Sequence, residues 1–206
     1  IRNQVSLSNS FGVCCKKVTL DDNSQYVVKE LVKSSDAYNS IFYEGKCLEF
    51  MNEKFPNHFP KVLYLKDNLL VMEFIEHNKV KDEKSEQDLA CRLARIHQIR
   101  NDQFGFEFDS PIGGLRQPSS FEKSWVNFYA NKRLNMIFEL INATNPMPDE
   151  INRGIERLLK NLNNLIPDNP QPSLIHGDLW EGNILFHNGK LVGLIDPGIY
   201  YAHYEI

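Results

Sequence analysis

The stretch at residues 176–183, which reads His-Gly-Asp-Leu-Trp-Glu-Gly-Asn, decides the fold. Within it, Asp178 and Asn183 are five positions apart, and Asp196 follows thirteen positions after Asn183. The segment between them predicts a β-hairpin, because Asn-Gly at residues 188–189 is a strong signal for a two-residue turn between β-prone runs. A loop and the end of a hairpin strand can bring the three polar side chains to one point.

These three residues suit the chemistry of phosphoryl transfer. Their spacing resembles that of the catalytic-loop Asp and Asn and the later metal-binding Asp of protein kinases. Mg²⁺ prefers hard oxygen ligands, and it neutralises the charge on a moving phosphoryl group. We expect Asn183 and Asp196 to hold Mg²⁺, and Asp178 to receive or orient the proton of the acceptor hydroxyl. An ordinary turn after a strand would explain any one of these residues, but not the whole string.

A pair of residues that anchors the nucleotide phosphates is expected upstream. Lys29 ends a β-prone run, where kinases place the lysine that bridges the phosphates. Glu44 shares one face of a predicted helix with apolar residues at offsets of 4, 7 and 11. A carboxylate on an apolar stripe is costly unless a cation meets it, so we expect Lys29 to pair with Glu44. Taken alone, Lys29 reads as a strand-edge lysine in solvent and Glu44 as a partly exposed helix charge.

Two further segments are expected around the nucleotide. Glu73, Phe74 and Ile75 end a strand just before a polar linker, where the backbone of a kinase hinge binds adenine. A buried strand explains the same residues, and both interpretations can hold together. The loop at residues 8–12 stands where a glycine-rich loop usually covers the phosphates, but it offers only one glycine. It is therefore a weak candidate for a phosphate clamp.

Composition excludes several classes of function. The chain has 206 residues, 42% of them hydrophobic, which suits a buried core rather than disorder. The net charge of −4 and the dispersed Lys and Arg argue against a nucleic-acid partner. No apolar run is long enough to cross a membrane. No signal peptide is visible, and since the chain begins at Ile1 we expect its natural N-terminus to lie upstream.

The four cysteines favour neither a disulfide framework nor a zinc site. Cys14 and Cys15 are adjacent in a predicted strand, and Cys47 and Cys91 lie singly in helical patterns. Because no Cys-x-x-Cys pair exists, we expect reduced thiols and a cytoplasmic location. The sequence carries no indication of oligomeric state.

The order of predicted elements is a β-rich segment with one helix, followed by a mainly helical segment with a late hairpin. The expected strands are residues 13–20, 25–31, 61–66, 69–75, 173–175, 184–186 and 191–195, and the expected helices are residues 36–55, 85–99 with Ser85 as N-cap, 121–142 and 148–166. Residues 105–120 read as a loop. The fold expected is α+β, with a nucleotide-binding lobe at residues 1–76 and a catalytic and substrate-binding lobe at residues 77–206.

With these residues in hand, the sequence resembles the fructosamine kinase (ketosamine-3-kinase) family. Residues 173–183, SLIHGDLWEGN, resemble the family's SLLHGDLWSGN, and residues 196–205, DPGIYYAHYE, resemble its DPAxYYGHRE. Upstream, residues 104–106, residues 113–118, Trp125, Phe128 and Arg133 also fit the family pattern. The Trp after HGDL separates this family from aminoglycoside and choline kinases, which share HGDxxxxN.

The resemblance implies a protein-kinase-like, two-lobed fold that uses ATP and Mg²⁺. It makes Asp178 the catalytic base, Asn183 and Asp196 the metal ligands, and Lys29 with Glu44 the phosphate anchor. Residues 73–75 become the adenine hinge, and Trp180 and His176 are placed at the acceptor. The implied reaction transfers the γ-phosphate of ATP to the 3-hydroxyl of a free or protein-bound ketosamine, which repairs glycated amines.

Departures from the family pattern leave the acceptor open. Tyr204, Gly198 and Ala202 stand where the family has Arg, usually Ala, and Gly. Family members continue beyond the position of Ile206, and we expect that part to pack against the helical lobe and to complete the acceptor pocket. An aminoglycoside, choline or sugar kinase of the same fold would share the chemistry and differ in the acceptor.

Proteins of two different classes also fit part of the sequence. A nucleotide-binding pseudokinase is suggested by the glycine-poor loop and by Tyr204. A metal hydrolase would use His176, Asp178, His203 and Glu205. The hydrolase interpretation leaves the Lys and Glu of the upstream pair unexplained and matches no zinc spacing.

Overall fold

The computed structural model describes residues 1–32 and 38–206. The chain forms an α+β structure with two compact units. The first contains residues 1–95, 110–116 and 176–199, and the second contains residues 96–109, 117–175 and 200–206. These units do not coincide with the lobes expected at residues 1–76 and 77–206, because residues 176–199 associate with the N-terminal sheet. The division into functional lobes stays a prediction.

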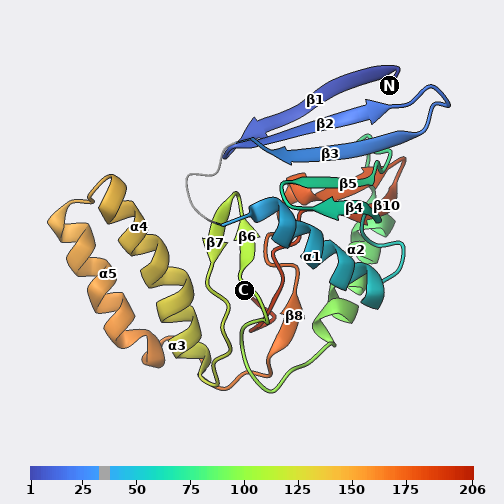
Figure 1. The fold of residues 1–206 in the computed structure, drawn as a ribbon. Helices are drawn as coiled ribbons and strands as arrows, with labels where there is room; N and C mark the ends of the chain where they lie inside the picture. Colours follow the sequence, from blue (N-terminus) through green and yellow to red (C-terminus); the bar gives the residue numbers. More distant parts are fainter. Residues whose placement is uncertain (33–37) are drawn as a thin grey trace. The chain divides into compact units, whose positions relative to one another are not determined.

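The first unit is built on a five-stranded antiparallel sheet in the order β1-β2-β3-β5-β4 (Figure 1). Its strands are β1 (Asn3–Ser10), β2 (Val13–Thr19), β3 (Gln25–Leu31), β4 (Val62–Lys66) and β5 (Leu69–Glu73). The four predicted strands in this region are therefore confirmed, and β1 is an additional strand at the sheet edge. Every residue of β1 is exposed. Polar and apolar residues alternate over residues 4–8, a short strand signal that the predicted strands did not include.

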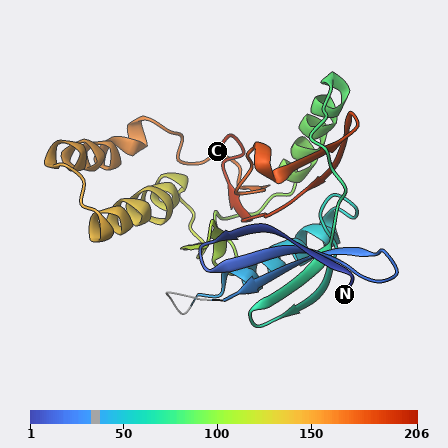
Figure 2. The same cartoon turned by 90° about the horizontal axis from the view of Figure 1, so that it is seen from above.

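Helix α1 (Ser40–Lys54) covers one face of this sheet (Figure 2). Asn39 caps its first turn by accepting a hydrogen bond from the backbone N–H of Phe42. The buried side of α1 includes Leu48 and Met51, which is the apolar face expected from the sequence. The predicted helix began at residue 36, and residues 36–37 lie outside the described residues.

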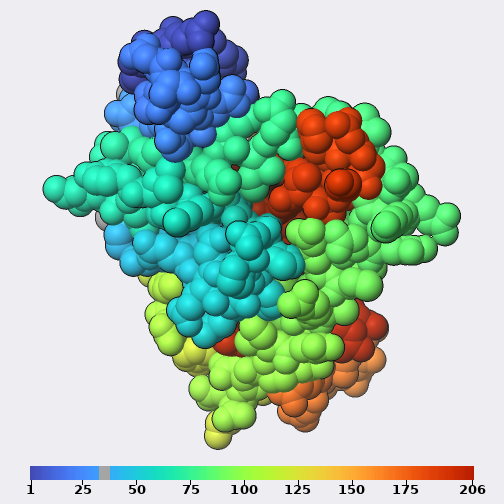
Figure 3. All heavy atoms as spheres, turned by 90° about the vertical axis from the view of Figure 1, so that its right-hand side faces the viewer, coloured from blue at the N-terminus to red at the C-terminus, as the bar shows by residue number. Residues whose placement is uncertain are grey.

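The hairpin of the first unit that follows the 176–183 loop consists of β9 (Ile184–His187) and β10 (Lys190–Leu194). The predicted Asn-Gly turn is confirmed, since Asn188 and Gly189 have φ values of +49° and +73° between the paired strands. Hydrogen bonds hold this hairpin to earlier parts of the unit. Phe186 O accepts from the backbone N–H groups of Asn78 and Lys79, and Leu194 N donates to His58 O. In Figure 3 the red atoms of the hairpin accordingly lie beside green atoms of the segment after β5.

Helix α2 (Glu83–His97) begins two residues before the predicted N-cap, so the assignment of Ser85 as N-cap is wrong. Asp82 takes that role, because its Oδ1 accepts from the backbone N–H of Ser85 at 2.8 Å. The Ser85 hydroxyl in turn accepts from the Asp82 N–H at 2.9 Å. This reciprocal arrangement is a capping box, in which Ser85 is the N3 residue.

The predicted loop at residues 105–120 contains a short hairpin. Its strands are β6 (Ser110–Ile112) and β7 (Leu115–Gln117), joined by Gly113 and Gly114 with φ values of +52° and +86°. Three-residue strands are too short to give a periodic signal, which is why composition alone indicated a loop. The pair of glycines was the local sign of a tight turn.

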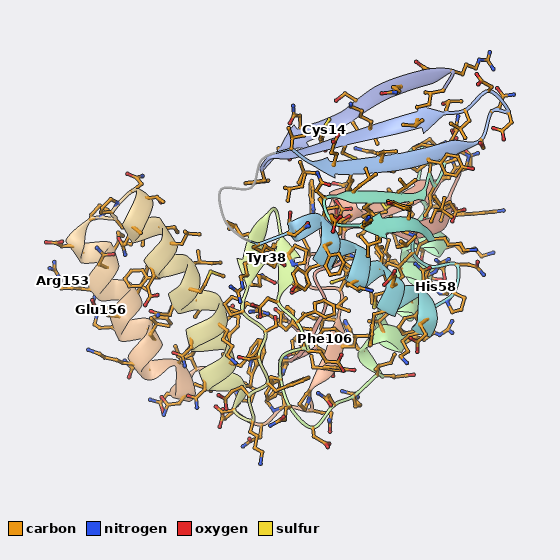
Figure 4. All side chains as sticks on the ribbon, in the orientation of Figure 1. Cys14, Tyr38, His58, Phe106, Arg153 and Glu156 are labelled. Atoms are coloured by element: carbon orange, nitrogen blue, oxygen red, sulfur yellow. The ribbon has the colours of Figure 1, made fainter. Side chains whose placement is uncertain are left out.

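The second unit contains the remaining helices and an antiparallel strand pair. Its elements are α3 (Trp125–Tyr129), a π-helical segment η1 (Ala130–Asn135), α4 (Met136–Thr144), α5 (Asp149–Asn161), η2 (Leu162–Asn164), β8 (Ser173–Ile175) and β11 (Tyr200–Ala202). The helix predicted at residues 121–142 begins later, because Ser124 caps α3 by accepting from the Asn127 N–H. Helix α5 carries exposed charged residues such as Arg153 and Glu156 (Figure 4).

An aromatic cluster forms the centre of the second unit. The ring centroids of Trp125 lie 5.1 Å from Phe104 and 5.8 Å from Phe128. Phe128 in turn lies 5.6 Å from Tyr200 on β11. The guanidinium of Arg133 is buried against the Phe128 and Tyr200 rings. Rings at these separations contribute packing energy beyond the area that they bury.

Two expectations about the environment can be compared with the described residues. All four cysteines are free thiols, and Cys15 and Cys47 are buried. Cys14 on β2, labelled in Figure 4, is half-buried, so adjacent cysteines face opposite sides of the strand as expected. Among residues 1–32 and 38–206, we find no helix with the length and apolar character needed to span a bilayer.

Candidate active site

Lys29 is the centre of a buried charge network in the first unit. It lies on β3 opposite Cys15 and Leu70, and only 8% of the residue is exposed. Its Nζ donates to Oε1 of Glu44 at 2.7 Å and to Oδ1 of Asp196 at 2.8 Å. The pairing of Lys29 with Glu44 that the sequence indicated is therefore present, and Asp196 joins it as a second carboxylate.

The two carboxylates keep Lys29 charged despite its burial. Burial by itself would lower the pKa of Lys29, but attraction to Glu44 and Asp196 outweighs it and holds that pKa above its ordinary value. Burial also raises the pKa of Glu44, and the Lys29 ammonium opposes that change. One cation thus faces two carboxyl groups, which leaves room for a further cation to be attracted.

The residues of the 176–183 loop meet Asp196 at the other side of this network. Asn183 Nδ2 donates to the backbone O of Asp178 at 2.7 Å and to its Oδ2 at 3.3 Å. Because the amide nitrogen is used in this way, the amide oxygen of Asn183 is the atom left to contact a metal. Burial raises the pKa of Asp178, with Asn183 lowering it and Asp196 raising it. Asp178 is thereby a better proton acceptor than an exposed aspartate.

Backbone contacts explain why the loop and the segment around Asp196 are so close. Gly198 N donates to His176 O at 2.9 Å, and Ile195 N donates to Asn183 O at 3.0 Å. Gly177 has a φ of +83°, and a Cβ atom on it would overlap the Gly198 carbonyl. Asp196 itself has a φ of +55°, an uncommon value for a residue other than glycine. Such strained backbone is often found at functional sites.

His176 is not at the surface of a cavity, so its assignment as a substrate contact needs correction. Only 2% of the residue is exposed, and its ring stacks on Phe59 at a centroid distance of 6.1 Å. Burial lowers its pKa to about 4, although Asp196 and the backbone of Ile195 oppose that shift. Its Nδ1 accepts from the Asp178 N–H at 3.4 Å. The neutral ring therefore packs inside the unit and supports the 176–183 loop through its hydrogen bond with Asp178.

Trp180 is placed differently, because 63% of it is exposed. Its ring lies over Gly182, where a Cβ atom would overlap the indole. It lines two cavities of the first unit, and both of them also contain Lys29, Asn183 and Asp196. A flat apolar ring in this position can form a wall for a ligand on either side.

The larger cavity, about 430 Å³, is the candidate nucleotide site. Glu73, Phe74 and Ile75 line it together with apolar residues of the sheet, and their assignment as the adenine hinge stays a prediction. Its size and mainly apolar lining suit a small-molecule site. The Lys17 ammonium stacks on the Phe74 ring at 3.7 Å from its centroid.

The smaller cavity, about 290 Å³, contains Asp178 and the Lys29 network. The sequence placed only the loop at residues 8–12 near the phosphates, as a weak candidate. The wall comes from the β1–β2 hairpin, the start of α1 and the β6–β7 hairpin: Ser8, Ser10, Phe11, Val13, Ser40, Ile41, Pro111, Gly113 and Gly114. Besides that loop, the glycine pair before Leu115 was a local signal for this wall. Serine hydroxyls stand near the position where a glycine-rich loop would offer backbone N–H groups.

The residues present fit a magnesium ion that phosphates help to hold. Asn183 and Asp196 offer two hard oxygen ligands, and Mg²⁺ commonly takes one or two protein ligands with phosphates and water. A metal site formed by protein side chains alone would need at least three such ligands close together. Among residues 1–32 and 38–206, no group of three or more His, Cys, Asp and Glu side chains could hold a metal.

Comparison with known sequences identifies one family. The sequence profile described as fructosamine kinase matches residues 11–206. An Enterococcus faecium protein named "probable ketoamine kinase" is 36% identical over 140 residues, which cover 66% of this chain and 48% of that protein. An Arabidopsis thaliana chloroplastic protein-ribulosamine 3-kinase is 31% identical over 185 residues, covering 84% of this chain and 56% of the relative. The chain thus spans about half the length of these curated relatives.

Solved structures show the same fold. A Thermobifida fusca protein with a provisional assignment as a fructosamine-3-kinase superposes with a TM-score of 0.86 and 26% identity, covering 98% of this chain and 70% of that one. The aminoglycoside phosphotransferase APH(2″)-IIa, solved with streptomycin and ATP, superposes with a TM-score of 0.68 and 22% identity, covering 100% and 69%. The protein-kinase-like α+β fold predicted from the sequence is confirmed.

Proposed function

The chain belongs to the fructosamine kinase family, and from that premise we propose that the protein transfers the γ-phosphoryl group of ATP to the 3-hydroxyl of a ketosamine. The acceptor class includes ribulosamines, erythrulosamines and fructosamines, either free or attached to protein. The names of the curated relatives, a ketoamine kinase and a ribulosamine 3-kinase, support this choice. The fold neighbour APH(2″)-IIa, solved with ATP, supports ATP as the donor.

The observation that carries the proposal is the network of Lys29, Glu44 and Asp196. A buried lysine held by two carboxylates, one from a helix and one from the loop after β10, is the arrangement that phosphoryl transfer uses to anchor phosphates. Asp178 and the network line one cavity, so a proton acceptor and a phosphate anchor face the same space. An ordinary structural ion pair would not need the adjoining cavities.

Each residue of the network has a proposed role. Lys29 binds nucleotide phosphate oxygens, and Glu44 keeps its ammonium in place. Asp178 takes the proton from the acceptor hydroxyl, for which its raised pKa suits it. Asn183 and Asp196 would hold Mg²⁺, which supplies charge neutralisation at the phosphates when bound.

The remaining proposed roles concern binding. The backbone of residues 73–75 binds adenine in the larger cavity, and the Trp180 ring forms a wall of the acceptor site. His176 is proposed to position Asp178 rather than to contact substrate. Its Nδ1 does so by accepting a hydrogen bond from the backbone N–H of Asp178. Free thiols support a reducing compartment, and the cytoplasm is the proposed location.

The test is phosphate transfer from MgATP by the full-length parent protein, followed by mass spectrometry of the acceptor. The acceptors are ribulose-lysine, erythrulose-lysine, fructose-lysine, a free sugar, choline and an aminoglycoside. Asp178→Asn is compared with Glu181→Gln, a control that removes an exposed carboxylate from the same loop. We expect transfer to a ketosamine by the wild type and by Glu181→Gln, and its loss in Asp178→Asn.

The same panel separates a ketosamine kinase from a kinase with a different acceptor and from a pseudokinase. Transfer to an aminoglycoside, choline or a sugar in preference to every ketosamine would replace the proposed acceptor while keeping the chemistry. Binding of MgATP without transfer to any acceptor would favour a pseudokinase. Full activity in Asp178→Asn would contradict its role as the base.

A further inference from the structure

The tip of the β1–β2 hairpin carries a bulky residue where the backbone favours a small one. Phe11 and Gly12 form a two-residue turn between the paired residues Ser10 and Val13, with φ values of +52° and +76°. Such turns ordinarily use Asn, Asp or Gly, because a larger side chain is crowded at positive φ. Phe11 is also 69% exposed. The hairpin itself does not explain a strained, exposed aromatic residue, and strain of this kind often has a functional reason.

The Phe11 side chain contacts a second turn, formed by Gly113 and Gly114 between β6 and β7. A Cβ atom on Gly114 would lie 2.5 Å from Cβ of Phe11, and one on Gly113 would lie 3.5 Å from the ring Cε2. The positive φ of both glycines makes any larger residue there strained as well. Phe11 therefore rests on bare backbone, and glycine at position 114 is required for that contact.

This contact forms part of the wall of the smaller cavity. Phe11, Gly113 and Gly114 all line the space of about 290 Å³ that contains Asp178 and Lys29. The rest of the wall is rich in charged and hydroxyl groups, which would themselves attract water. Phe11 and Trp180 are the aromatic rings of this wall, and Phe11 is the one that lies across two hairpin tips, where it can exclude water.

We propose that Phe11, seated on Gly113 and Gly114, keeps water out of the phosphoryl-transfer cavity, so that the acceptor hydroxyl takes the phosphoryl group. The proposal rests on the proposed function. In the side reaction that it prevents, a water oxygen bonds to the γ-phosphorus of ATP. The bond from that phosphorus to the bridging oxygen breaks, and its electron pair stays on ADP. The proton of the water passes to Asp178, so the same base serves both reactions and does not discriminate between them. Exclusion of water then adds to the positioning of the acceptor in favouring transfer.

The test measures inorganic phosphate and phosphorylated acceptor in the same reaction of the full-length protein with MgATP and ketosamine. Phe11→Asn removes the ring but suits the turn, so the hairpin is kept. Phe121→Asn is the matched control, because Phe121 is also an exposed phenylalanine outside any helix or strand and lines neither cavity. We expect phosphate released per acceptor phosphorylated to rise about tenfold in Phe11→Asn and to stay at the wild-type value in Phe121→Asn.

A second readout does not depend on activity. Hydrogen–deuterium exchange of residues 110–117 should be faster in Phe11→Asn than in the wild type, because the contact with the glycine turn is lost. An unchanged ratio of hydrolysis to transfer, with normal thermal stability, overturns the proposal. If the wild type hydrolyses ATP but phosphorylates no ketosamine, the proposed function fails, and a rise in hydrolysis in Phe11→Asn still supports the role of Phe11. If the wild type turns over no ATP, the hydrogen–deuterium exchange is the deciding measurement. An equal exchange rate at residues 110–117 in Phe11→Asn and the wild type would overturn the proposed contact of Phe11 with the glycine turn.

Discussion

Lys29 in the first unit and Arg133 in the second are both buried cations, but they are held by different kinds of partner. Two carboxylates bind Lys29, and both come from segments that line cavities. Arg133 is 5% exposed, and its Nη1 donates at 2.8 Å to the backbone oxygens of Pro118 and Lys132. Its guanidinium lies 3.9 Å from the centroid of the Tyr200 ring.

The partners decide what each buried charge can do. Carboxylates can be exchanged for phosphate oxygens or can turn toward a metal, so Lys29 remains available to a ligand. Carbonyls and ring faces inside the aromatic cluster offer no such exchange, and Arg133 joins the helical segment to β11 through the Phe128 and Tyr200 rings. Burial of a charge alone therefore does not indicate a catalytic role.

The largest effect is expected from replacing Lys29, the buried cation that the comparison makes available to a ligand. Lys29→Met should lower kcat for phosphoryl transfer by roughly 10²–10³-fold, because a preorganised charge at the phosphates is lost. The matched control is Lys46→Met, which removes a half-exposed lysine of α1 that pairs with Glu49. Steady-state kinetics with MgATP and the preferred acceptor measure the change.

A double variant separates activity from stability at the same site. Lys29→Met leaves Glu44 buried without its cation, which destabilises the fold, whereas Lys29→Met with Glu44→Leu removes both charges. Urea unfolding should show that the double variant recovers stability, while its transfer rate stays low. Recovery of transfer in the double variant would mean that Lys29 is a structural cation like Arg133.

The next effect is on the stability of the second unit. Arg133→Met should lower the free energy of unfolding by about 2–4 kcal/mol, because two carbonyls lose their donor and the rings lose their cation. Arg153→Met on α5 removes an exposed arginine and should change the free energy of unfolding by less than about 0.5 kcal/mol. Denaturant unfolding measures both. Folded Arg133→Met should keep the wild-type KM for ATP, and a large rise in that KM would contradict a purely structural role.

The smallest effect is expected at His176, a buried titratable group that stays neutral, unlike the charged and paired Lys29 and Arg133. Its pKa of about 4 in the folded protein is below the ordinary 6.5, so the unfolded chain binds the proton more readily. Its contribution to stability is complete above pH 6.5 and is lost as pH falls toward 4. Between pH 7.5 and 5.5 the wild type should lose about 1 kcal/mol more than His176→Phe, which keeps a ring on Phe59 but cannot titrate. Equal losses, measured by urea unfolding at the two pH values, would contradict the lowered pKa.

The parts of the site that sequence could predict are those whose chemistry demands a residue type at a fixed spacing. The spacing of Asp178, Asn183 and Asp196 around an Asn-Gly turn identified the loop and hairpin, and a carboxylate on an apolar helix face identified Glu44 as the partner of Lys29. Most helices and strands followed from periodicity, with ends displaced where a cap such as Asp82 was overlooked. These signals are local, so one sequence contains them.

The remaining parts depend on contacts that no local pattern encodes. The Lys29–Asp196 ion pair joins residues 167 positions apart, and the contact of Phe11 with the glycine turn joins two hairpin tips. His176 was assigned to the substrate from its place in a motif, whereas its burial results from packing on Phe59. The strand β1 is an exception, because the alternation of polar and apolar residues at residues 4–8 was a local signal that was overlooked.

The two tryptophans lie in different units and in opposite surroundings. Trp125 is buried among the rings of the second unit, whereas Trp180 is exposed beside both cavities of the first. Indole emission shifts to longer wavelength as its surroundings become more polar. The natural sequence therefore contains two optical probes, a short-wavelength one for the aromatic cluster and a long-wavelength one for the cavities. Ligand titration and unfolding can thus be followed in a single unlabelled sample.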